Sequence, residues 1–360
     1  MNILVLNPGA RILDFALYAG KAQAPLRSGR LADYRGAEMC RAALQNIEKS
    51  CRRALPAKAR PAAWAVRIPF GGEIFTRPVL LNREHIRSLE TLVPLSPLHL
   101  PAIMELLAIL QNEYAAQPVV LAFETAFFAE LPQREAGYAL DPALMDAGAF
   151  RRFGAHGLLH EAACAHVCRL RKIRHLPAPA KILSLCLDPQ PEVAAVLRDR
   201  PVMVTSGLTP LEGLPGQTTC GELDPGIIMT LSEKLKWGPE RIDTVLTRES
   251  GLLGLTGERA TLEAVLSAER YKGSLGQKVM NYRLLLACGA GIAALGGLNH
   301  IVFSGRYAAL GKILGPALIS RLLMRRRARP AGIQWSCLPR SRERIIADHA
   351  LTVLMALPVR

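Results

Sequence analysis

The stretch TPLEGLPGQTTCGELDP, Thr209–Pro225, has neither helical nor strand periodicity and contains three glycines and three prolines. We therefore predict a long loop of defined shape. Ordering such a loop costs conformational entropy, and a simple connection needs few residues, so this length is typical of a functional site. Its glycines can present open backbone amides, while Glu212, Glu222 and Asp224 offer oxygens to a metal ion or a basic group. A proline-stiffened turn without a ligand is the alternative.

The composition predicts a two-domain chain that prefers anionic partners. With 360 residues, 50% of them hydrophobic, the chain can bury a large core. Its net charge of +15 suits a nucleotide, a nucleic acid or an acidic lipid. The densest basic run, Arg321–Arg329, contains no aromatic residue for base stacking. We expect a solvated helix end there, so a nucleic-acid partner is not favoured.

The cysteines and apolar segments favour a cytoplasmic protein without a membrane span. Eight cysteines occur without a CxxC pair, which suits a reducing compartment. No charged leader precedes the first apolar run, and Asp14 interrupts the next, so we expect no signal peptide. Leu284–Leu298 is the one segment that resembles a span, but it is short and contains four glycines. We predict a buried helix there.

Apolar runs alternate with amphipathic ones, which predicts an α/β protein. In the first half, the runs Met1–Leu6 and Ile12–Ala19 flank a turn and predict a pair of strands. In the second half, Lys181–Leu187 and Val193–Leu197 flank the turn Asp188–Gln190 in the same way. This repeat of strand, turn and strand indicates an internal duplication.

Six stretches in order along the chain resemble the acetate kinase family, carboxylate kinases of the actin-like sugar kinase superfamily. They are Asn7–Gly9, Arg67–Thr76 (RIPFGGEIFT), Pro94–Pro101 with Phe123–Phe127 (FETAF), Arg151–His160 (RRFGAHGLLH), Thr209–Pro225 and Ser250–Gly257 (SGLLGLTG). The resemblance implies two duplicated actin-like (ribonuclease H-like) α/β domains around a central cleft. The first would comprise residues 1–140 with the C-terminal helix 342–360. The second, residues 141–341, would carry the nucleotide side and the dimer contact.

The resemblance also implies Mg²⁺ and ATP as cofactors, and acetate or another short carboxylate as substrate. Arg67 matches the arginine that grips the carboxylate, a task suited to a bidentate guanidinium. His99 and His156 match histidines that face the transferring phosphoryl group, with His156 stabilising the transition state, and Glu124 stands where the family has an aspartate. The remaining matches are Asn7 and Glu343 at the magnesium end, and Gly213, Gly216, Thr219 and Gly305 on the nucleotide side.

The departures from the family pattern concern the phosphate and nucleotide contacts. Ala10 and Arg11 follow the first turn, where the family has small hydroxyl residues and then a lysine. At Cys186–Gln190 this chain reads CLDPQ. The family has there a stretch that begins with histidine and contains a glycine-asparagine-glycine turn. Thr219 takes the place of the transition-state arginine, and Arg306–Leu310 replaces a glycine-rich adenosine loop. We expect these changes to lie on one side of the cleft.

Two functions are consistent with these observations. The first is ATP-dependent phosphorylation of a short carboxylate to an acyl phosphate, with a degraded nucleotide site. The alternative is a catalytically inactive relative that binds a metabolite or a protein. In either case the resemblance implies a homodimer.

A zinc site is a separate hypothesis. His156, His160, Cys164 and Cys168 recur every four residues and would share one helix face. On successive turns the first and last would lie roughly 18 Å apart, too far to ligate one ion. We therefore favour a buried cysteine face.

Overall fold

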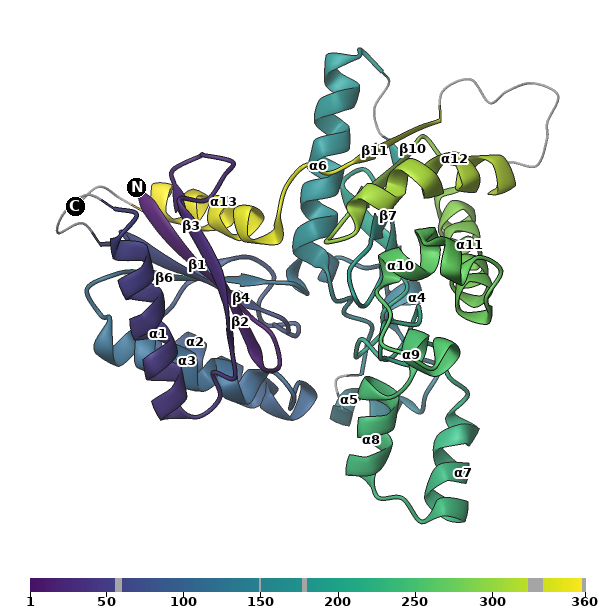
Figure 1. Ribbon diagram of the computed structural model, residues 1–360, viewed down its shortest axis with the longest axis horizontal. Coiled ribbons are helices and arrows are strands. Elements are labelled where there is room, and N and C mark those ends of the chain that lie inside the picture. The colour runs from purple at the N-terminus through teal and green to yellow at the C-terminus, as the bar shows by residue number, and fades with distance from the viewer. Residues whose placement is uncertain (56–59, 149, 177–179, 323–332, 358–360) are drawn as a thin grey trace. The chain divides into compact units, whose positions relative to one another are not determined.

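A computed structural model describes residues 1–55, 60–148, 150–176, 180–322 and 333–357, and divides the chain into two compact units (Figure 1). Unit 1 comprises Met1–Ala129 and Arg340–Arg360, and unit 2 comprises Glu130–Pro339. Each unit contains one sheet with helices against it. The C-terminal segment returns to the unit that holds the N-terminus.

The sheet of unit 1 has the order β3-β2-β1-β4-β6-β5. The strand β1 pairs antiparallel with β2, and β1, β4 and β6 are parallel. Residues on β1, β4 and β6 are buried on both faces because α13 packs against all three strands, while α1, α2 and α3 cover the other side (Figure 1). The elements are β1 (Asn2–Pro8), β2 (Ile12–Ala19), β3 (Arg27–Ala32), β4 (Ala63–Ile68), β5 (Val79–Leu80), β6 (Val119–Phe123), α1 (Ala37–Arg52), α2 (Arg83–Leu92), α3 (Leu100–Glu113) and α13 (Arg342–Met355).

The sheet of unit 2 has the order β11-β10-β7-β8-β9. The strands β7, β8 and β9 form an antiparallel meander, and β7, β10 and β11 are parallel. The helix α6 packs on β7 and β10, and α11 packs on β8. The elements are β7 (Lys181–Cys186), β8 (Glu192–Leu197), β9 (Arg200–Val204), β10 (His300–Ser304), β11 (Gln334–Cys337), α4 (Gln133–Ala136), α5 (Pro142–Gly148), α6 (Gly157–Ile173), α7 (Pro225–Leu235), α8 (Pro239–Arg248), α9 (Gly251–Thr256), α10 (Leu262–Ser267), α11 (Leu275–Leu295) and α12 (Gly311–Leu322).

The two sheets repeat one topology. Three antiparallel strands come first in each unit, and one later strand, β4 or β10, then pairs in parallel with the first strand. A further parallel strand, β6 or β11, follows it, and in unit 1 the edge strand β5 is antiparallel. Each unit therefore begins with a strand, a turn and an antiparallel strand. The predicted internal duplication is confirmed.

Most predicted elements are present, and the differences have physical reasons. The strand β3 was not predicted because its sequence, RSGRLA, is polar and its side chains are largely exposed. The helix α11 buries one stripe of side chains rather than its whole surface, and Tyr282 and Leu286 are exposed. No helix among the described residues is long and apolar enough to cross a membrane. Thr209–Pro225 is irregular until α7 begins at Pro225, as predicted. The basic run Arg321–Arg329 lies outside the described residues after Leu322.

Candidate active site

In unit 1, the predicted site residues gather at the carboxyl ends of three parallel strands. Asn7 is near the end of β1, Arg67 is near the end of β4, and Glu124 directly follows β6. Ligands of open α/β sheets commonly bind at this edge. Glu343 reaches the same place from the first turn of α13.

Arg67 is the centre of this network. Its Nε donates to Glu124 Oε1 at 2.7 Å, and its Nη1 donates to Asn7 Oδ1 at 3.3 Å and to the Pro8 carbonyl at 2.9 Å. Asn7 Nδ2 donates in turn to Glu343 Oε1 at 2.7 Å. The structure therefore joins these four side chains in one hydrogen-bonded network.

Glu124 is fully buried and accompanied by two arginines. Besides Arg67, Arg342 Nη1 lies 3.4 Å from Glu124 Oε1, and each arginine side chain is 13% exposed. A buried carboxylate is tolerated only when it is paired. Glu124 is thus the shared counterion of two arginines within unit 1, and Arg67 already pairs with a carboxylate of its own chain. The role of Arg342 was not predicted, although its position next to Glu343 offered a signal.

The side chain of His99 is neutral at pH 7, because burial and the charge of Arg67 both disfavour its protonated form. Burial lowers the pKa of His99, and the positive charge of Arg67 lowers it further, to about 4. His99 Nδ1 is buried and makes no hydrogen bond within the described part of the chain. The neutral imidazole can therefore donate or accept a hydrogen bond with a ligand, but it supplies no positive charge.

In unit 2, His156 is held at the start of α6 by its backbone and its ring. The amides of Ala155 and His156 donate to the carboxylate of Glu192 at 2.8 and 3.0 Å. His156 Nε2 donates to the Gln190 carbonyl at 2.8 Å, because a carbonyl oxygen can only accept. Gln190 lies in the turn between β7 and β8, and Glu192 is the first residue of β8.

Glu192 is the buried carboxylate of unit 2. His160 Nε2 hydrogen-bonds to Glu192 Oε1 at 3.1 Å, and His160 Nδ1 hydrogen-bonds to Ser184 at 2.8 Å. Burial alone would raise the pKa of Glu192, but the hydrogen bond and charge of His160, with help from His156 and Ser206, lower it to about 2. Sequence reasoning did not include Glu192, which could have been noticed as a charged residue opening the apolar strand EVAAVL.

The central loop packs directly on the turn after β7. Gln217 donates its backbone N–H to the Pro189 carbonyl at 2.7 Å, and Gln190 Nε2 donates to the Leu214 carbonyl at 2.9 Å. The hydroxyl of Thr219 donates to Gln190 Oε1. A Cβ at Gly216 would overlap the ends of the Gln190 and Thr219 side chains and lie 3.0 Å from the Pro189 carbonyl, so a larger residue would force these groups to shift. Thr219, predicted on the nucleotide side, is thus bonded to the chain itself.

The end of β10 completes this region of unit 2. Gly305 has φ +86°, and the amide of Arg306 donates to Asp188 Oδ1 at 2.6 Å. Tyr307 is buried and its hydroxyl donates to Gln217 Oε1 at 2.8 Å. Gly213, with φ +103°, lies against the Thr205 carbonyl. Two pairs of residues that depart from the family pattern therefore bond to each other in unit 2, Asp188 with Arg306 and Gln190 with Thr219.

The departures from the family pattern occur in both units. Ala10 and Arg11 belong to unit 1, whereas Asp188, Thr219 and Tyr307 belong to unit 2. Arg11 is exposed and pairs with Asp33 at 3.1 Å.

The four-residue series of histidines and cysteines has separate partners. His160 bonds to Ser184 and Glu192, while Cys168 Sγ donates to Asp199 at 3.2 Å. Cys164 is buried. The series therefore does not converge, and the helix-geometry objection to that zinc site holds.

Comparison with known proteins is consistent across sequence and structure. The model of the Acetokinase family matches residues 27–309. The chain belongs to this family. It is 31% identical to the acetate kinase of Pseudarthrobacter chlorophenolicus over 84% of this chain and 81% of that one. It is 33% identical to the acetate kinase of Streptomyces coelicolor over 68% of this chain, but that match spans only 60% of the relative's length.

Solved structures show the same fold. The acetate kinase of Porphyromonas gingivalis superposes with a TM-score of 0.83 at 23% identity, covering 98% of this chain and 99% of that one. A propionate kinase from Francisella tularensis gives a TM-score of 0.80 at 23% identity, covering 97% and 98%. The predicted actin-like α/β fold is confirmed. The acetokinase family uses ATP and Mg²⁺.

Proposed function

We propose that this protein is a carboxylate kinase of the acetate kinase type, which transfers the terminal phosphoryl group of ATP to acetate or another short carboxylate. The observation that carries the proposal is the network of Asn7, Arg67, Glu124 and Glu343 in unit 1. Phosphoryl transfer needs little covalent help from a protein, because it depends on positioned anions and on cations that stabilise the developing charge.

Arg67 would bind the substrate carboxylate. Its guanidinium is planar and partly exposed, and it already bonds a carboxylate oxygen of Glu124. An incoming carboxylate would share Arg67 with Glu124 or displace it, and Arg342 remains close enough to balance Glu124. This arrangement lets Arg67 change partners without leaving a buried charge unpaired.

The residues at the same edge suit the magnesium ion that the family uses. Asn7 and Glu343 offer the hard oxygen ligands that Mg²⁺ prefers, and they already bond to each other. ATP would supply the phosphoryl group, and Mg²⁺ would neutralise its charge. His99, neutral at pH 7, would give a hydrogen bond to the phosphoryl group, and His156 of unit 2 keeps the transition-state role that the resemblance implies.

Acyl phosphate formation, trapped as a hydroxamate, tests this function. Arg67→Ala should lower the rate by at least about a hundredfold, the effect of one well-placed electrostatic donor. Arg77→Ala is the matched control, since Arg77 is an exposed arginine directly after the same stretch. If the wild-type protein forms no acyl phosphate and ATP does not raise its unfolding temperature, the kinase proposal is wrong.

A non-catalytic binding protein is the second candidate, and the self-bonded loop of unit 2 favours it. Thr219 bonds to Gln190, where the family has an arginine near a glycine turn, and Tyr307 is buried where it has a glycine-rich loop. The double variant Gln190→Gly/Thr219→Arg removes this contact and restores the cation. An increase in hydroxamate formation would support a weakened kinase, whereas an inactive variant that folds would support the binding protein.

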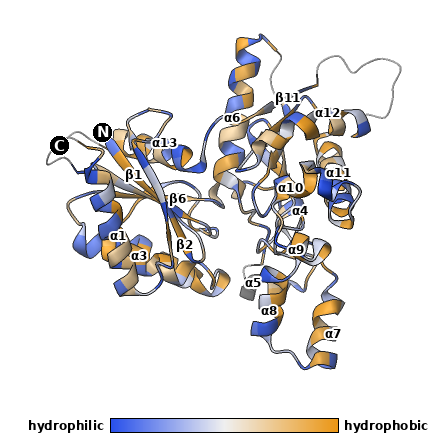
Figure 2. Ribbon diagram, in the orientation of Figure 1, coloured by the Kyte–Doolittle hydropathy of each residue, from blue (hydrophilic) through white to orange (hydrophobic). Residues whose placement is uncertain are grey.

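We also propose a homodimer in a reducing, cytoplasmic environment. The helix α7 has no buried side chain and exposes Ile227, Ile228, Met229 and Leu235, and much of its ribbon has the hydrophobic colour in Figure 2. Several large apolar side chains exposed on one helix are typical of an interface. All eight cysteines are free thiols. Light scattering on the wild type and on Met229→Lys would show whether the dimer forms and whether α7 contributes to it.

A further inference from the structure

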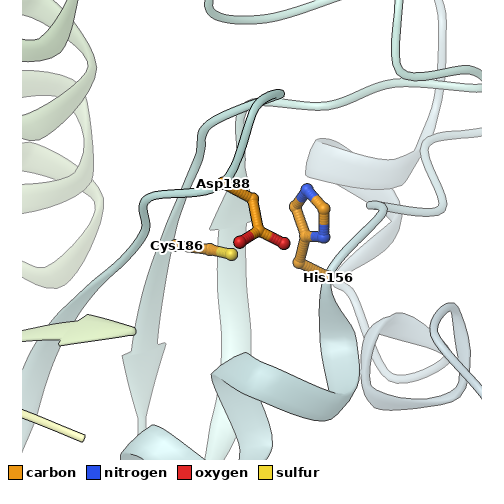
Figure 3. Close-up of side chains that lie close together, drawn as sticks. All are labelled: His156, Cys186 and Asp188. Carbon is orange, nitrogen blue, oxygen red and sulfur yellow. The ribbon is translucent and has the colours of Figure 1, made fainter. Parts of the chain in front are cut away.

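Three metal-binding side chains meet in unit 2 in a combination that the proposed kinase reaction does not need. His156, Cys186 and Asp188 each offer a ligand atom, and these atoms all lie within 4.8 Å of one another. Figure 3 shows the Asp188 carboxylate between the sulfur of Cys186 and the ring of His156. We propose that these residues bind a divalent transition-metal ion of the zinc type.

The fold brings the three residues together through two packed elements. Cys186 is the last residue of β7 and Asp188 lies two positions further, so both side chains leave the chain on the same side. His156 directly precedes α6, which packs against β7. All three belong to unit 2, so its internal packing alone determines their proximity.

The donor set selects the kind of ion. An imidazole nitrogen, a thiolate sulfur and a carboxylate oxygen are the ligands that Zn²⁺ takes in proteins, whereas Mg²⁺ prefers oxygen alone. On binding, the Cys186 thiol gives its proton to solvent and its sulfur donates an electron pair to the metal. The thiolate and the Asp188 carboxylate together carry two negative charges, which balance a divalent ion in a largely buried place.

The separations require a small contraction. Bonds of about 2.0 to 2.3 Å in a tetrahedral site place the ligand atoms roughly 3.3 to 3.8 Å from one another. The three side chains would therefore move together by about 1 Å, within reach of small rotations about their χ angles. Three protein ligands leave the fourth position to water or an anion.

The groups around the three ligands restrict their orientation. His156 Nε2 donates to the Gln190 carbonyl, so a metal bound through the other ring nitrogen leaves this hydrogen bond intact. Asp188 Oδ1 accepts the Arg306 amide at 2.6 Å. Hydrogen bonds of this kind orient metal ligands in known sites. The proposed site uses neither Asn7 nor Glu343 of unit 1 but shares His156 with the proposed kinase function, and its metal binding can be measured without kinase activity.

Metal titration of the full-length protein tests the proposal. After treatment with a chelator, the wild type should bind one equivalent of Zn²⁺ in competition with an indicator. Co²⁺ bound in its place should show the sulfur-to-metal absorption of a cobalt thiolate. Cys186→Ser should abolish this absorption, and both Cys186→Ser and Asp188→Asn should weaken zinc binding by more than about 100-fold, since even outer partners cost 10- to 100-fold.

The matched control is Cys168→Ser. Cys168 also lies beside a carboxylate, with its Sγ 3.2 Å from Asp199, but is not part of the three-residue group. This variant should bind zinc like the wild type. The proposal is overturned if the wild type does not bind one equivalent of Zn²⁺, or if folded Cys186→Ser and Asp188→Asn bind it as tightly as Cys168→Ser.

Discussion

The two units share a strand order but differ in the turn after their first strand. In unit 1 the turn after β1 closes on itself, with the Gly9 amide donating to the Ile12 carbonyl at 2.7 Å. The side chains at that edge bond to one another through the Arg67–Glu124 ion pair and the Asn7 amide. In unit 2 the turn after β7 is closed by the central loop, through the amide of Gln217. One backbone topology thus supports a charged cluster in one unit and a self-bonded loop in the other.

A fully buried glutamate in each unit sharpens this difference. Glu124 of unit 1 balances two arginine side chains. Glu192 of unit 2 accepts two backbone amides and the ring of His160. Removing the charge of Glu124 leaves like charges in unit 1, whereas removing that of Glu192 chiefly weakens hydrogen bonds to the start of α6.

The largest expected effect is that of Glu124→Gln. Arg67 and Arg342 would lose their buried counterion, which should destabilise unit 1 by about 3–5 kcal/mol. Hydrogen exchange resolved by peptide should show faster exchange in β4 and β6 and little change in β7 and β8. Glu84→Gln, on the exposed first turn of α2, is the control. Equal protection in the variant and the control would show that Glu124 is not the counterion of unit 1.

Acidification should lower the stability of unit 2 by protonating Glu192. The pKa of Glu192 is about 2, below its usual 4.5, so its contribution is complete above pH 4.5 and is lost as the pH falls toward 2. A shift of this size corresponds to roughly 3 kcal/mol. Urea unfolding between pH 5 and 2.5 should therefore show a smaller pH dependence for Glu192→Gln than for the wild type. An unchanged slope would mean that Glu192 is not held as an ion.

The stability of unit 1 should depend on pH through His99, in a range above that of Glu192. The pKa of His99 is about 4, below the usual 6.5, because the buried ring is favoured in its neutral form. Its contribution is therefore complete above pH 6.5 and is lost as the pH falls toward 4. We expect about 2 kcal/mol, allowing for partial exposure. His300 in unit 2 also has a pKa of about 4. Comparing His99→Gln with the wild type therefore separates the contribution of His99 to the pH dependence of stability from that of His300. Identical pH profiles would contradict it.

The extent to which sequence reasoning succeeded depends on which interactions are local. Apolar runs identified β2, β7 and β8 because each is largely buried, while polar β3 gave no such signal. Family resemblance named Asn7 and Arg67, and their place at adjacent strand ends made proximity predictable. The pairing of Arg67 with Glu124 and the meeting of His156 with Cys186 depend on side-chain packing between distant segments, which no local pattern encodes.

The smallest expected effect concerns Arg11, which stands near the position where the family has a lysine. It is exposed and paired with Asp33, another exposed residue, and such a pair contributes little to stability. If unit 1 keeps its function through the buried network alone, Arg11→Ala should leave both the unfolding midpoint and acyl phosphate formation unchanged. A loss of activity comparable to that of Arg67→Ala, at unchanged stability, would instead show that Arg11 leaves Asp33 to bind phosphate. The turn after β1 would then belong to the site. The two units would then differ in the function of this turn as well as in the side chains at their strand ends.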